Sequence, residues 1–146
     1  MSRSRISRFL ALLGVGGVAM ACNTGGETID NPFPDADQEP NDTVDTASVL
    51  VGAGTVTVTG ECHTPTDVDH FSKVSGTSGN ATAAIDADVP LASVALLTSS
   101  GSVLITTSAG GPYQVTVAVD SANGVVILRL TCDGATGAYS GTMETP

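Results

Sequence analysis

The sequence predicts an all-β protein, folded as an antiparallel β-sandwich of about eight short strands. Apolar and polar residues alternate from Thr55 onward, and this period of two is typical of half-buried strands. The chain has 17 glycines, no tryptophan and few charged residues of the kind that cover helices, which indicates short strands and turns. About eight such segments fall within roughly 108 residues, the size of a single sandwich domain.

The N-terminus is organised like an export signal. Arginines lie among residues 1–8, residues 9–20 are apolar, and Ala19-Met20-Ala21 forms a small-residue cleavage pattern. The apolar stretch is shorter than the about 20 residues that a membrane-spanning helix needs. We therefore expect residues 1–21 to be removed as a signal peptide.

Cys22 follows the predicted cleavage point directly. Residues 18–22 (VAMAC) resemble a bacterial lipobox, which implies that Cys22 becomes an acylated first residue anchored in the lipid bilayer. Three cysteines are present, so one is left over from any pairing, and lipidation would use it. Several acyl chains would make the attachment stable. The predicted location is the bacterial cell envelope, at the outer membrane or cell surface; the alternative is plain cleavage with an unmodified thiol.

Residues 22–38 predict a lipid anchor and a flexible acidic tether, because they mix glycine, proline and acids without apolar periodicity. The alternative is that this segment packs on the domain through Phe33. After Ala21 only Lys73 and Arg129 oppose 15 acidic residues, so the formal charge is 2 minus 15, or -13. Such a charge repels polyphosphate and excludes nucleic acid as a partner.

The domain spans residues 39–146. A helical turn is expected within residues 42–50, capped by Asn41, Asp42 or Thr43. The predicted strands then follow in order at residues 55–62, 68–74, 81–87, 92–98, 102–107, 113–120, 124–132 and 137–143.

The alternation places both remaining cysteines on inward faces. Cys62 shares its face with Val56 and Val58, and Cys132 lies on the face of the apolar residues before it. In an oxidising compartment this predicts a buried Cys62–Cys132 disulfide joining two edge strands. Closing a loop of 71 residues (132 − 62 + 1) stabilises by about 4 kcal/mol in the chain-entropy model. The alternative is a zinc site of Cys62, His63 and His70, although their spacing matches no standard zinc cluster.

Five segments occur in a characteristic order: DQEPNDTVDTASVL, TGECHTPTDVDHFSKV, LASVALLTSSGSVL, GGPYQVTV and TGAYSGTM. Their most specific parts are E-P-N-D-T at residues 39–43 and D-V-D-x-F at residues 67–71. This series resembles the bacterial pre-peptidase C-terminal domain over about residues 39–146. The resemblance implies a jelly-roll type β-sandwich without catalysis of its own.

The same resemblance implies a structural calcium site. Relatives such as the collagen-binding modules of clostridial collagenases bind calcium where acids at the start of the domain meet acids of the later D-x-D turn. Flexible segments rich in carboxylates provide the six to eight oxygen ligands that calcium takes. The alternative is that these acids only form turns and caps. The matching positions are Asp37, Glu39, Asn41, Asp42, Asp67 and Asp69.

No catalytic residues are predicted, because the chain lacks a G-x-S-x-G elbow and has only two histidines, His63 and His70. His70 is expected to be a structural ring. We expect a non-catalytic, envelope-anchored binding or scaffolding module with an unidentified protein or polysaccharide ligand. The alternatives are an accessory factor for a secreted peptidase and a minimal hydrolase that uses His63 or His70.

Overall fold

The computed structural model describes residues 38–120 and 124–146. In this part of the chain the backbone forms one turn of 3-10 helix, η1 (Val44–Thr46), and nine strands. The strands are β1 (Ser48–Val49), β2 (Thr55–Cys62), β3 (Val68–Val74), β4 (Gly79–Ala87), β5 (Leu91–Thr98), β6 (Val103–Thr106), β7 (Tyr113–Val119), β8 (Val125–Cys132) and β9 (Gly137–Glu144).

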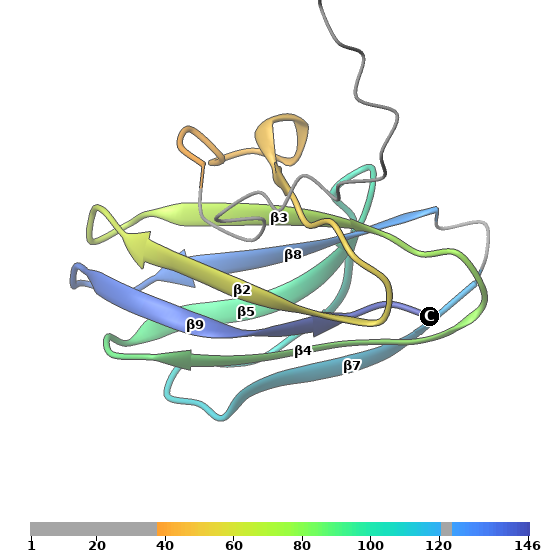
Figure 1. The fold of residues 1–146 in the computed structure, drawn as a ribbon. Helices are drawn as coiled ribbons and strands as arrows, with labels where there is room; N and C mark the ends of the chain where they lie inside the picture. Colours follow the sequence, from red (N-terminus) through yellow and green to blue (C-terminus); the bar gives the residue numbers. More distant parts are fainter. Residues whose placement is uncertain (1–37, 121–123) are drawn as a thin grey trace, which may run out of the picture.

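The strands form two sheets that pack as the layers of a sandwich (Figure 1). One sheet has the order β1-β3-β8-β5-β6, and the other has the order β2-β9-β4-β7. All pairs are antiparallel except β1 with β3, which is parallel. The predicted all-β sandwich is therefore confirmed, and β2 to β9 match the eight predicted strands to within about two residues. The predicted signal peptide, Cys22 and residues up to 37 lie outside the described residues.

The alternation of the sequence becomes the core of the sandwich. On β2, Val56, Val58 and Cys62 are buried while the threonines between them are exposed. The apolar run on β5 is buried on both faces: Val94 and Leu96 enter the main core, while Ala95 and Leu97 join a smaller cluster with Ile127. A strand covered on both sides needs no alternation, which explains its continuous apolar sequence.

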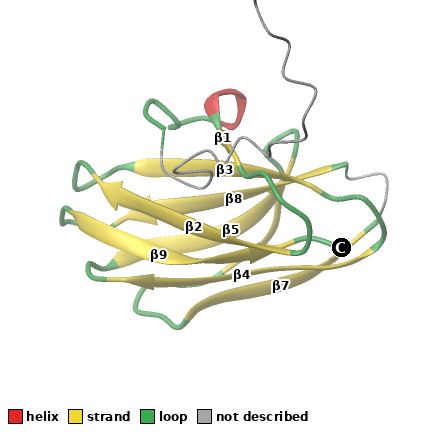
Figure 2. Cartoon of the chain, viewed as in Figure 1, coloured by secondary structure: helices red, strands yellow, loops and turns green. Residues whose placement is uncertain are grey.

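The segment before β2 covers part of the five-stranded sheet. Val44 of η1 packs against the smaller cluster, and Leu50 is buried in the main core. Figure 2 shows the single helical turn beside the sheet of β3. Thr43 caps this turn, as expected, and its carbonyl accepts from Thr46 N at 3.1 Å.

The helical turn ends earlier than predicted. The sequence pattern placed residues up to Leu50 within it, but Ser48 and Val49 instead form β1 and pair with Phe71 and Ser72. That part of the prediction is wrong because a parallel pairing with a strand more than 20 residues away leaves no local pattern.

The predicted Cys62–Cys132 disulfide is present and buried, with 5.9 Å between the two Cα atoms. It connects β2 of one sheet to β8 of the other. The expectation that both strands are edge strands is wrong for β8, which lies between β3 and β5. Parity identifies the face on which a cysteine lies but not its strand's neighbours, so only the inward direction could be predicted.

Candidate functional site

Three loops meet at one end of the sandwich and are tied together through their backbones. Gly134 N donates to Pro65 O at 2.9 Å, which joins loop 133–136 to loop 63–67. Asp133 N donates to Pro90 O at 3.1 Å, which joins loop 133–136 to loop 88–90. We call these three loops the acidic end. Their mutual bonds, next to the disulfide at Cys62 and Cys132, fix the relative positions of their side chains.

A histidine and two carboxylates gather at the acidic end. His63 Nδ1 lies 3.3 Å from Glu39 Oε1 and 3.6 Å from Asp67 Oδ2. One possible ligand atom from each residue lies within 4.8 Å of the other two. Asp67 is positioned by the backbone, because its carboxylate accepts from His63 N at 2.6 Å and from Val68 N at 3.2 Å. This grouping offers oxygen and nitrogen ligands to a cation.

The other residues of the predicted calcium set are placed differently. Asn41 is buried, and its Nδ2 lies 3.5 Å from Ser48 Oγ, whereas Asp42 is exposed. Asp69 points into the sandwich, and Asp37 lies outside the described residues. The structure thus brings Glu39 and Asp67 together and adds His63, which the sequence pattern did not include among the calcium ligands.

Asp69 makes a polar contact between the two sheets. Its Oδ2 accepts a hydrogen bond from Tyr139 Oη at 2.7 Å, and the Tyr139 ring meets Phe71 edge-on with 6.3 Å between centroids. Gly60, the cross-strand partner of Tyr139, leaves the space that this ring occupies, because a Cβ on Gly60 would overlap the ring. A buried carboxylate is tolerated when it is hydrogen-bonded, so we assign Asp69 a structural contact. Nothing in the D-V-D-x-F pattern indicated this partner.

His70 fastens the N-terminal segment to β3. The carbonyl of Asn41 accepts from His70 N at 3.1 Å and lies 3.2 Å from His70 Nδ1. Because a carbonyl oxygen only accepts, this contact places the ring proton on Nδ1. Burial lowers the pKa of His70 below 6.5, and the Arg129 guanidinium lowers it further, against the opposing effects of the Asn41 hydrogen bond and Asp42. His70 is the buried structural ring that the sequence predicted.

The disulfide excludes Cys62 from the zinc site considered in the sequence analysis, and it also limits the hydrolase alternative. A cysteine in a disulfide has no thiolate, which is the form that attacks a substrate or binds zinc. Cys62 therefore serves neither as a nucleophile beside His63 nor as a zinc ligand while the bond is intact.

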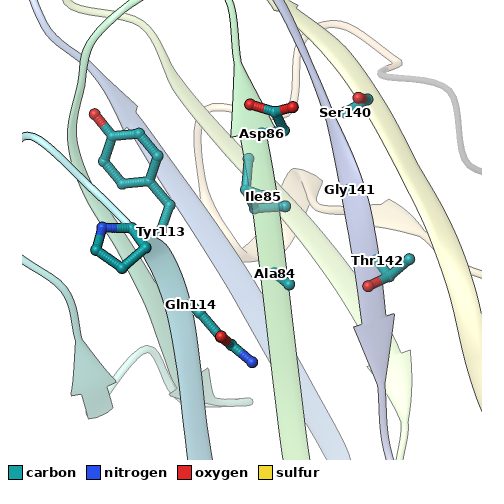
Figure 3. A pocket seen from close by; sticks show the side chains of 9 residues that line it. Ala84, Ile85, Asp86, Tyr113, Gln114, Ser140, Gly141 and Thr142 are labelled. Carbon is teal, nitrogen blue, oxygen red and sulfur yellow. The ribbon is translucent and has the colours of Figure 1, made fainter.

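A shallow groove crosses the outer face of the four-stranded sheet. Figure 3 shows Asp86, Gln114, Ser140 and Thr142 on three adjacent strands, β4, β7 and β9. The groove has a volume of about 310 Å³, and a second hollow of about 100 Å³ shares Asp86 and Ser140 with it. Asp88 lines the second hollow and belongs to the acidic end. We call the two hollows together the outer groove. Sequence reasoning missed it because the groove depends on which strands are neighbours.

The described surface exposes acidic residues without exposed basic ones. Of the two cations that remain after Ala21, Lys73 is only 2% exposed and Arg129 is partly buried. The exposed carboxylates are those of Glu39, Asp42, Asp45, Glu61, Asp86, Asp88, Asp120, Asp133 and Glu144. The electrostatic potential of this surface therefore attracts cationic partners.

Comparisons with known proteins show the fold and no closer relationship. No protein-family model matches the chain, and neither does any curated protein sequence. The pre-peptidase C-terminal domain of a collagenase from Bacillus anthracis is similar in structure, with a TM-score of 0.52 and 14% identity over 64% of this chain and 91% of that domain. A periplasmic inhibitor of g-type lysozyme from Aeromonas hydrophila is also similar in structure, with a TM-score of 0.50 and 14% identity over 64% of this chain and 87% of the inhibitor. The fold therefore resembles the pre-peptidase C-terminal domain, as the sequence motifs predicted.

The low pKa of His70 predicts a loss of stability on acidification. Below pH 6.5 the unfolded histidine takes up a proton that the folded one resists, so the free energy of unfolding falls as the pH drops toward the folded pKa. Urea unfolding from about pH 7 to about pH 5 measures this slope. His70→Gln removes the titrating group, so the free energy of unfolding of the variant should depend less on pH. Equal slopes for the wild type and the variant would contradict the low pKa of His70.

Proposed function

We propose that the mature chain is a non-catalytic, lipid-anchored β-sandwich on the bacterial envelope that binds a cationic protein through the outer groove. The observation that carries the proposal is the described surface, which exposes nine carboxylates and no fully exposed cation. Opposite charges steer association and select partners. The outer groove is a concave part of this acidic surface, because Asp86 and Asp88 line it. The hydrogen-bonded loops of the acidic end hold Asp88 in position.

The two similar structures support this assignment at the level of the fold. One is a periplasmic inhibitor of g-type lysozyme, and the other is a domain of a collagenase. The lysozyme inhibitor shows that a similar sandwich can bind another protein in the periplasm. Among the described residues no helix has the length and apolar character to cross a membrane. Attachment in our proposal depends on acylated Cys22 and the tether of residues 22–38.

The anchor is tested by fractionation. Cys22→Ser removes the only thiol that the disulfide leaves over, so the expected result is a shift of most of the protein from the membrane fraction to the soluble fraction. Mass spectrometry of the wild-type N-terminus is expected to detect acyl chains on Cys22. An unmodified N-terminus with unchanged fractionation of the variant contradicts the lipid anchor.

Binding is tested with a g-type lysozyme as the first basic probe and with a basic cytochrome c as the control for charge alone. We expect lysozyme binding that weakens with salt. Asp86→Asn with Asp88→Asn should weaken it by about tenfold, because both carboxylates line the outer groove. Surface plasmon resonance measures the change.

Asp45→Asn with Asp120→Asn provides the matched control. It removes the same charge from exposed positions outside the groove, so its effect should stay within about twofold. Equal losses for the two variant pairs would show that net charge alone drives binding. Failure of both basic probes to bind would contradict a cationic partner.

We also propose that calcium stabilises the acidic end. Glu39 and Asp67 are the predicted ligands that lie together, and His63 joins them. Asp37 and Asp42 belong to the same proposed set, whereas Asp69 is held inside the sandwich by Tyr139 and Asn41 is buried. The ion would neutralise nearby carboxylates and fasten the end of the tether to the domain.

Millimolar calcium is expected to raise the unfolding midpoint relative to a chelator, as measured by circular dichroism. Glu39→Gln should reduce the increase, because it removes a carboxylate from the cluster, and Glu61→Gln, an exposed residue outside the cluster, should not. An identical melting curve with calcium and with chelator removes the metal site.

The accessory role beside a secreted peptidase remains a second proposal, because one of the two similar structures is a domain of a collagenase. The hydrolase alternative depends on His63, whose neighbours Glu39 and Asp67 are both acids. It would require a nucleophile other than Cys62.

A further inference from the structure

Lys73 is a buried cation that none of the preceding functions uses. It lies on β3 with its side chain on the same face as Asp69 and Phe71, and it is 2% exposed. Its Nζ donates a hydrogen bond of 2.6 Å to the carbonyl of Gly52. No carboxylate of the described residues forms an ion pair with it.

This environment is unfavourable for an isolated ammonium. The group has three N–H donors, and the Gly52 carbonyl accepts from only one of them. Withdrawing a charge from water is unfavourable unless an opposite charge or further hydrogen bonds replace the lost hydration. The arrangement therefore favours a partner that accepts hydrogen bonds and carries negative charge.

A cavity of about 340 Å³ adjoins Lys73. It lies at the far end of β3 from the acidic end, near the chain end marked C in Figure 1, where Thr145 and Pro146 contribute to its wall. The turn of residues 52–54 forms another part of the wall.

The turn supplies additional donors of the right kind. Gly52 and Gly54 have backbone φ angles of 144° and 67°, which residues other than glycine rarely adopt. No backbone carbonyl of the described residues accepts from the amides of Gly52, Ala53 or Gly54. Backbone amides in such turns, together with an ammonium, form concave sites that bind anions.

We infer that this cavity binds a small monocarboxylate, either a free carboxylic acid or the C-terminal carboxylate of a peptide. Lys73 is the one charged side chain that lines the cavity, so it can balance a single negative charge. The acidic surface of the described residues as a whole repels multiply charged anions more strongly than singly charged ones. A carboxylate brings one charge and two acceptor oxygens. Capture of a terminal carboxylate by backbone amides is a known mode of peptide recognition.

Titration of the isotope-labelled chain with sodium acetate tests the inference, with chloride exchanged for acetate to keep the ionic strength constant. We expect saturable shifts of the Gly52 and Gly54 amide resonances, and a shift of the Lys73 Nζ resonance with the same midpoint. A peptide with a free C-terminal carboxylate compared with its amide distinguishes the two sources. A response to acetate and not to the peptide assigns a free acid, whereas tighter binding of the free peptide than of acetate assigns a C-terminus.

Lys73→Met keeps most of the apolar stem and removes the charge, and it is expected to weaken acetate binding at least tenfold. Arg129→Met removes the other cation, which is absent from the cavity, and should leave the affinity unchanged within about twofold. Linear shifts without saturation, or equal affinity in Lys73→Met, would show that Lys73 only holds the turn. If Lys73→Met does not fold, the wild-type Nζ resonance decides, because an unmoved signal overturns the proposal.

Discussion

The two sheets are joined across the interior at the acidic end, and the position of every surface feature there depends on this connection. The Cys62–Cys132 disulfide links β2 to β8, and two residues earlier along β2 Gly60 makes room for Tyr139. The Tyr139 hydroxyl crosses the interior to Asp69 on β3. A disulfide and a buried hydrogen bond therefore both connect the two sheets at the same end of the sandwich. Loops that begin and end there have little freedom to separate, because their strands are connected and their backbones are bonded to one another.

The inward face of β3 carries opposite charges on the two sides of Phe71. Asp69 is matched by a hydroxyl from the opposite sheet, whereas Lys73 reaches a loop carbonyl and adjoins a cavity. The two charges differ in their surroundings, because Asp69 is enclosed between the sheets whereas Lys73 adjoins a cavity that a ligand can enter. Because Lys73 is buried, it does not offset the acidic charge of the surface, which suits a cationic partner. The cavity beside Lys73 at the other end of β3 suits an anion.

Sequence periodicity predicted the strands well, because a half-buried strand must alternate, as β2, β7 and β9 do. It failed for β1, whose two residues are strand only through their parallel contact with Phe71 and Ser72. It also assigned β8 to an edge, although that strand lies between two others. At the candidate site, Glu39 and Asp67 were identified from their motifs, but their contact with His63 was not, and the outer groove had no local signature.

The sequence by itself determined the fold class, the inward direction of Cys62 and Cys132, and the acidic balance of charge, because each depends only on composition or on parity along one strand. The tertiary structure decided which strands are neighbours, and with them the outer groove, the partner of Asp69 and the cavity at Lys73. Parity assigns a side chain to one face of a sheet and carries no information about the strand across from it. Those lateral and facing partners are selected by packing between residues far apart in the chain, which no local pattern records.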